Sequence, residues 1–124
     1  MVFRGKVTFF DGRPMPHALV VITCNLAPPR NIVGHVSCNE QGVFEGEIPA
    51  TYAPMSIKHS FWTIYRLEQG GRCWSAGKSI VYVGNIGPSS THPNEMKLTA
   101  ERDVDWVSCS VPQGTGDNLG RSHF

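Results

Sequence analysis

Proline and glycine interrupt this chain so often that no window is long enough for an amphipathic helix. Among its 124 residues are 9 prolines and 13 glycines, and both residue types disfavour the interior of a helix. Between these interruptions, apolar and polar residues alternate with a period of two, which is the pattern of a half-buried β-strand. We therefore predict an all-β fold, an antiparallel β-sandwich of seven to nine strands. Candidate strands lie at residues 2–10, 17–24, 31–38, 42–48, 55–67, 78–84, 94–99 and 103–111.

The length of the chain predicts a single domain. This domain spans residues 1–111, because the polar, glycine-rich stretch 112–124 lacks any period and is predicted to be a flexible C-terminal tail. In the alternative reading, the tail is an arm that docks on a neighbouring molecule through Phe124. The start MVFRGKVTFF has no long apolar region and no small-residue cleavage site, so we expect no signal peptide.

The charge balance points away from nucleic acids and membranes as partners. Eleven basic and ten acidic residues leave a net charge of +1, and the basic residues are scattered singly along the chain. A surface that binds phosphates would need clustered lysines and arginines. No apolar run of about 18 residues is present that could span a bilayer. The partners that we expect are therefore proteins.

The four cysteines leave two interpretations open. None of Cys24, Cys38, Cys73 and Cys109 forms a C-x-x-C pair, so a structural zinc site has poor support and metal binding is the least favoured interpretation. Buried free thiols are one interpretation, because cysteine packs as a small apolar residue. One or two disulfides are the other, and the sequence does not rank the three possible full pairings.

No motif in the chain predicts catalysis, a metal ion or a cofactor. The stretch GGRCWSAGKS ends like a phosphate-binding loop, but Arg72 occupies the position of its first glycine, and a strand pattern follows instead of a helix. The five histidines have none of the spacings typical of metal sites. The G-x-S-x-G elbow of serine hydrolases is also absent. We therefore predict that the protein is not an enzyme.

The longest apolar run has aromatic residues on both faces of its predicted strand. Phe61 and Tyr65 share one face, whereas Trp62 and Ile64 share the other. Such a strand is predicted to be covered on both sides, either by a loop of the same chain or by another subunit. A patch of this kind would mark an interaction surface. The candidate interface residues are Trp62, Ile64, Trp74, Tyr82 and Phe124.

The first apolar runs, in GKVTFFDGRPMPHALVVI, flank a turn and predict a β-hairpin. Asp11, Gly12 and Pro14 are the predicted turn residues, and Gly42 is the predicted turn glycine of the later stretch SCNEQGVFEGEIP. Both stretches resemble the carboxypeptidase regulatory-like domain family, over about the first 50 residues. One departure is His17, which stands where that family usually has glycine.

This resemblance implies a transthyretin-like (prealbumin-like) sandwich, related to immunoglobulin-like folds, and a non-enzymatic accessory, adhesive or assembly role. From these features we predict a structural or assembly protein that binds by surface burial on a larger particle, in concrete form a virion decoration or accessory subunit. It would then lie on the surface of a virion or other particle, in a large assembly or a homo-oligomer. The first alternative is a secreted, extracellular module that binds carbohydrate or protein. The second is a small enzyme with a site on loops at one end of the sandwich, which would be tested at His59 and His92.

Overall fold

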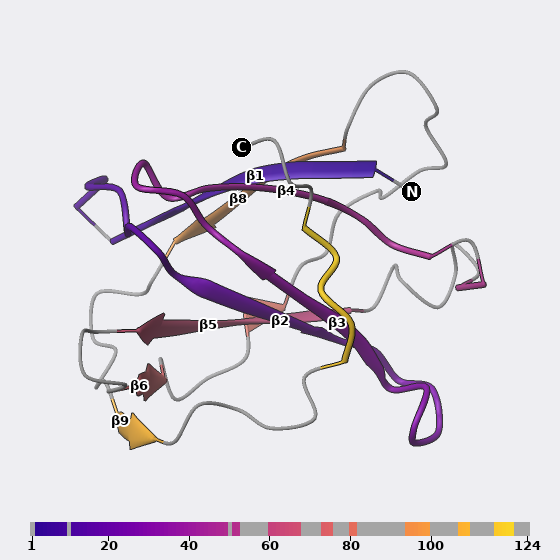
Figure 1. The fold of residues 1–124 in the computed structure, drawn as a ribbon. Helices are drawn as coiled ribbons and strands as arrows, with labels where there is room; N and C mark the ends of the chain where they lie inside the picture. The colour runs from indigo at the N-terminus through magenta and orange to yellow at the C-terminus, as the bar shows by residue number, and fades with distance from the viewer. Residues whose placement is uncertain are drawn as a thin grey trace.

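The computed structural model describes residues 2–9, 11–49, 51–52, 60–67, 73–75, 80–81, 94–99, 107–109 and 116–120. These residues form strands and no helix, so the predicted all-β class is confirmed (Figure 1). The strands are β1 (Val2–Thr8), β2 (Leu19–Thr23), β3 (Ile32–Ser37), β4 (Val43–Glu47), β5 (Phe61–Leu67), β6 (Cys73–Ser75), β7 (Ile80–Val81), β8 (Asn94–Thr99) and β9 (Val107–Cys109).

The strands belong to two sheets. The smaller has the order β4-β1-β8, and the larger has the order β3-β2-β5-β6-β9, with β7 also paired to β5. All of these pairs are antiparallel except β1 with β8, which run parallel from Phe3 opposite Asn94 to Thr8 opposite Thr99. The sequence pattern predicts antiparallel pairs only. The difference arises because an alternating pattern identifies a strand but carries no information on the direction of its neighbour.

The predicted opening hairpin is wrong, because β1 and β2 lie in different sheets (Figure 1). The turn itself is present: the backbone N–H of Phe9 donates to the Arg13 carbonyl at 2.8 Å, and that of Met15 donates to the Val7 carbonyl at 3.0 Å. After this short ladder the chain crosses to the larger sheet and begins β2. The turn therefore connects two sheets rather than two paired strands.

Aromatic side chains from both sheets meet in one core. Phe3 on β1 and Phe44 on β4 come from the smaller sheet, and Trp62 on β5 comes from the larger; all three are fully buried. The rings of Phe3 and Trp62 lie edge to face with centroids 5.2 Å apart, and those of Phe44 and Trp62 are 6.1 Å apart. Such edge-to-face contacts add to the free energy gained from burying the rings.

Strand β5 turns its Trp62 face inward. Trp62 and Ile64 have no exposed surface, whereas Phe61 on the other face is 37% exposed. This corrects the prediction that Trp62 and Ile64 belong to an interface, since a fully buried side chain has no surface left for a partner. Aromatic residues on both faces made the inward face of this strand ambiguous in the sequence.

The structure places three of the four predicted turn residues, Asp11, Gly12 and Gly42, in turns or bends, and it places Pro14 in a β-bridge just after the first turn. Asp11 accepts a hydrogen bond from the backbone N–H of Arg13 at 3.1 Å, and Gly12 has a φ of +90°. Pro14 forms an isolated bridge with Thr8, at the end of β1. Gly42 has a φ of +75°, and a Cβ atom there would lie 2.5 Å from the Val7 carbonyl oxygen.

Candidate functional site

A short segment near the C-terminus crosses the side of the molecule where both sheets end. Residues 116–120, here called the strap, pass from β3 to β4 and are the yellow segment of Figure 1. Both β3 and β4 are terminal strands of their sheets. The strap therefore covers one edge of each sheet, although its residues belong to the tail that was predicted to be flexible.

The backbone of the strap is bonded to both edge strands. The His35 N–H donates to the Asp117 carbonyl at 3.0 Å, and the Leu119 N–H donates to the His35 carbonyl at 2.8 Å, in a parallel bridge. On the other side, the Glu47 N–H donates to the Leu119 carbonyl at 3.0 Å. The strap thus satisfies backbone groups that an open sheet edge would leave unpaired.

The side chain of Leu119 anchors the strap. It is only 7% exposed and packs within the same core as Phe3 and Trp62. Two glycines allow this close approach: a Cβ atom at Gly34 would lie 2.6 Å from Leu119 Cγ, and one at Gly46 would lie 2.4 Å from the Leu119 carbonyl oxygen. Gly34, Gly46 and the edge strands β3 and β4 together form the surface that holds the strap and its Leu119 side chain, here called the groove.

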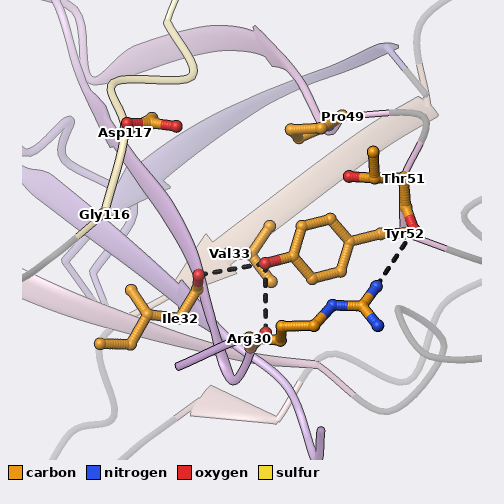
Figure 2. A pocket seen from close by; sticks show the side chains of 8 residues that line it. All are labelled: Arg30, Ile32, Val33, Pro49, Thr51, Tyr52, Gly116 and Asp117. Carbon is orange, nitrogen blue, oxygen red and sulfur yellow. Dashed lines mark hydrogen bonds between the residues drawn. The ribbon is translucent and has the colours of Figure 1, made fainter. Parts of the chain in front are cut away.

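A pocket of about 660 Å³ lies where the strap begins (Figure 2). Three segments that are distant in the sequence form it: the start of β3 with the residues before it, the turn after β4, and the first strap residues. Its lining residues are Arg30, Ile32, Val33, Pro49, Thr51, Tyr52, Gly116 and Asp117.

Tyr52 and Arg30 form one wall of this pocket (Figure 2). The Tyr52 hydroxyl lies 3.1 Å from the Arg30 carbonyl oxygen and 3.2 Å from that of Ile32, so its single proton is shared between two acceptors. The Arg30 guanidinium lies 5.7 Å from the centre of the Tyr52 ring and donates to the Thr51 carbonyl at 3.3 Å. Asp117, which is exposed, lies across the pocket from this pair. The mouth thus presents both signs of charge, an arrangement suited to polar segments of a protein partner.

Among the described residues, two pKa values are displaced from their ordinary range, and both belong to residues outside the strap and the pocket. Hydrogen bonds from the backbone and side chain of Arg13 hold the pKa of Asp11 below its usual value. Burial raises the pKa of the Cys38 thiol to about 12, which keeps it protonated and unreactive at neutral pH. Across the described residues, no three His, Cys, Asp or Glu side chains lie together as a metal site would require.

The other predicted site residues are spread over the molecule. Trp74 lies in β6, whereas Tyr82 and Phe124 lie outside the described residues, as do His59 and His92. Cys24 and Cys38 are buried free thiols. Cys73 and Cys109 stand opposite each other in the pairing of β6 with β9.

Neither the strap nor the pocket is predicted by the sequence pattern. The available signal for the strap was Leu119, the one apolar residue of Gly116 to Gly120, flanked by polar residues and glycines. For the pocket, the signal was Tyr52, an aromatic residue within a turn rich in proline and alanine. Both signals are single residues, whereas secondary-structure patterns need several.

No family model, curated protein or solved structure matches this chain. The resemblance to the carboxypeptidase regulatory-like domains therefore stays a prediction from the turn residues of the first half. Within the part of the chain that the structure describes, there is no helix of the length and apolarity needed to cross a membrane.

Proposed function

We propose that this chain is a non-enzymatic assembly subunit, a β-sandwich of transthyretin-like type with seven to nine strands, that joins other copies of itself through the groove between β3 and β4. The contact of Trp62 with Phe3 and Phe44 between the two sheets supports the sandwich. The groove supports the binding role, because it already holds an extended segment of the protein itself.

The observation that carries this proposal is the way in which the strap is held. Main-chain hydrogen bonds to His35 and Glu47 fix its backbone, and the Leu119 side chain fills a site between the sheets. This combination is how a sheet edge recognises an added peptide strand: backbone bonds supply affinity and a side-chain site supplies specificity. The strap thus binds to the groove in the way that a peptide from another chain would.

The occupant that we propose in the assembly is the strap of a second copy. Exchange of an identical element between protomers keeps every contact of the closed monomer, so it costs little free energy. Residues 110–115 connect β9 to the strap, and a connection of this length can reach at most about 25 Å when extended. Copies that exchange straps would therefore lie side by side along their β3–β4 edges.

Oligomeric state as a function of concentration tests the proposal. We expect a mass above the 13.7 kDa of one chain by sedimentation, and a melting temperature that rises with protein concentration. Leu119→Asp should abolish the oligomer, because it places a charge in the core site. Leu119→Ala keeps the backbone bonds and should only weaken it, while Phe61→Ala, on the exposed face of β5, is the control. A monomer with a constant melting temperature at every concentration would contradict the proposal.

The setting of such an assembly is a separate question that native fractionation answers. We propose the surface of a larger particle, with a virion as the concrete form, because an exchanged strap joins subunits without any catalytic group. Fractions of the source material would be followed by mass spectrometry for this chain. Migration with a heavy particle supports this setting, and elution as a free monomer or small oligomer contradicts it.

A further inference from the structure

The pairing of β6 with β9 brings two cysteines together. The register places Cys73 opposite Cys109, Trp74 opposite Ser108 and Ser75 opposite Val107, in an antiparallel ladder. In the strand order, β9 lies at the end of the larger sheet and β6 is its neighbour. The two cysteines are 36 positions apart in the sequence (109 − 73 = 36), so this proximity comes from the fold alone.

Opposite positions of an antiparallel ladder have the spacing that a disulfide needs. Their Cα atoms lie about 4.5 or 5.5 Å apart, depending on the hydrogen-bonding pattern, and disulfides join Cα atoms about 4.4–6.8 Å apart. Residues at opposite positions also belong to the same face of the sheet. The register of Cys73 opposite Cys109 therefore has the Cα spacing that a disulfide requires.

The other two cysteines are placed where they cannot pair with each other. The Cys24 N–H bonds to the Asn31 carbonyl at one end of the β2–β3 ladder, and the Cys38 N–H bonds to the Ala18 carbonyl at the other. Cys24 and Ala18 are six positions apart at the two ends of β2, or about 20 Å along an extended strand. Both thiols are also buried. Of the disulfide pairings that the sequence left open, the fold therefore favours Cys73 with Cys109 and disfavours Cys24 with Cys38.

We propose that Cys73 and Cys109 form a disulfide across β6 and β9 when the protein meets a small-molecule disulfide such as oxidised glutathione. One cysteine thiolate attacks the glutathione disulfide, forming a mixed disulfide and releasing one glutathione. The second thiolate then attacks the protein sulfur of that mixed disulfide and releases the other glutathione. The protein loses two electrons and two protons, and the glutathione disulfide is reduced to two thiols.

This bond would close a loop that links the two sheets. Between Cys73 and Cys109 the chain contributes β7 to the larger sheet and β8 to the smaller one, beside β1. A covalent link at the end of the loop restricts the unfolded chain and so favours the folded state. The inference is independent of the strap, because it concerns the opposite end of the larger sheet from β3.

Peptide mapping without reduction tests the pairing. The full chain would be equilibrated in a mixture of reduced and oxidised glutathione, quenched with acid, alkylated in denaturant and cut with trypsin. Each cysteine falls in its own tryptic peptide: 7–30, 31–58, 73–78 and 103–121. We expect peptide 73–78 linked to peptide 103–121, with the other two peptides alkylated. The oxidised chain should melt above the reduced chain, by about 5–10 °C.

Serine variants provide the controls. Cys73→Ser and Cys109→Ser should each remove the linked peptide and the gain in melting temperature, whereas Cys24→Ser should keep both. A link that involves peptide 7–30 or 31–58 would overturn the inference, and so would alkylation of all four cysteines after oxidation. Because the mapping is performed on the unmodified chain, it decides the question even if a variant fails to fold.

Discussion

His17 holds a backbone conformation that side chains other than glycine rarely adopt. Its φ is +56°, and its backbone N–H donates to the Asn39 carbonyl at 3.1 Å just before β2 begins. A side chain in this left-handed region costs about 1–2 kcal/mol. Glycine is the residue that the resembling family usually has here, and the φ gives a physical reason for that preference.

We therefore predict that His17→Gly stabilises the protein. The expected gain in the free energy of unfolding is about 0.5–1 kcal/mol, because relief of the strain exceeds the entropy that glycine loses on folding. Urea denaturation of both chains measures it. Ser37→Gly, at an exposed position in β3, is the matched control and should lower stability by about 0.5–1 kcal/mol. A loss of stability in both variants would show that His17 is not strained.

The buried thiol of Cys38 makes stability depend on alkaline pH. Burial raises the pKa of this group from 9.0 to about 12 in the folded chain, so above pH 9 the unfolded chain releases a proton that the folded chain retains. This contribution to stability is complete below pH 9 and is lost as the pH rises toward 12. Compared with Cys38→Ala, the native chain should lose up to about 1.4 kcal/mol more per pH unit in this window. Parallel slopes in chemical denaturation at pH 8–11 would contradict the prediction.

At the scale of elements, the turn between β3 and β4 depends on one side chain. Asn39 Oδ1 accepts hydrogen bonds from the backbone N–H groups of Gln41 at 2.9 Å and Val43 at 3.0 Å. The Val43 N–H is partly buried, and a buried donor without an acceptor costs about 1–3 kcal/mol. This turn also sets the register in which β4 meets β1.

Asn39→Ala should therefore destabilise the protein by about 1–2 kcal/mol, whereas Asn39→Asp, which keeps the acceptor, should be close to neutral. Thermal unfolding of the two variants measures the difference. Asp11→Ala is a useful comparison, because the hydrogen bonds of Asp11 to Arg13 are exposed. Its expected loss is within about 0.5 kcal/mol. Equal losses for Asn39→Ala and Asn39→Asp would rule out the hydrogen bonds as the cause.

The elements also show what the sequence can predict and what it cannot. Alternation predicted the positions of β1 to β4 to within two residues at each end. Strand β4 buries alternate residues, as this pattern requires, whereas β2 buries Leu19 to Ile22 in succession. Alternation missed β6, since three residues, Cys73–Ser75, are too few to show a period. It also missed the strap, where a single leucine supplies the burial. The alternating pattern does not predict which strands pair, because pairing depends on contacts between residues far apart in the chain.

Across the whole molecule, Trp62 is the side chain that joins the two sheets. It belongs to the larger sheet and contacts Phe3 and Phe44 of the smaller one, and its indole N–H donates to Ser60 Oγ at 2.8 Å within the core. Trp62→Ala should lower the free energy of unfolding by about 3–5 kcal/mol. The adjacent Phe61 is the matched control.

Phe61 is 37% exposed on the opposite face of β5, so Phe61→Ala should cost about 1 kcal/mol or less. The comparison is made by chemical denaturation of both variants at one protein concentration. A larger loss for Phe61→Ala than for Trp62→Ala would mean that the other face of β5 is the buried one.

The parallel pairing of β1 with β8 affects how the chain folds during its synthesis. Strand β1 leaves the ribosome first, but the strand that covers one of its edges begins only at Asn94. At about 5–20 residues per second, that edge waits for roughly 5–20 seconds before its partner is made. During this interval its backbone N–H and C=O groups can pair with any other extended chain nearby. The smaller sheet can be completed only after Asn94–Thr99 has been translated, so a nascent chain that stalls before Asn94 is expected to need a chaperone.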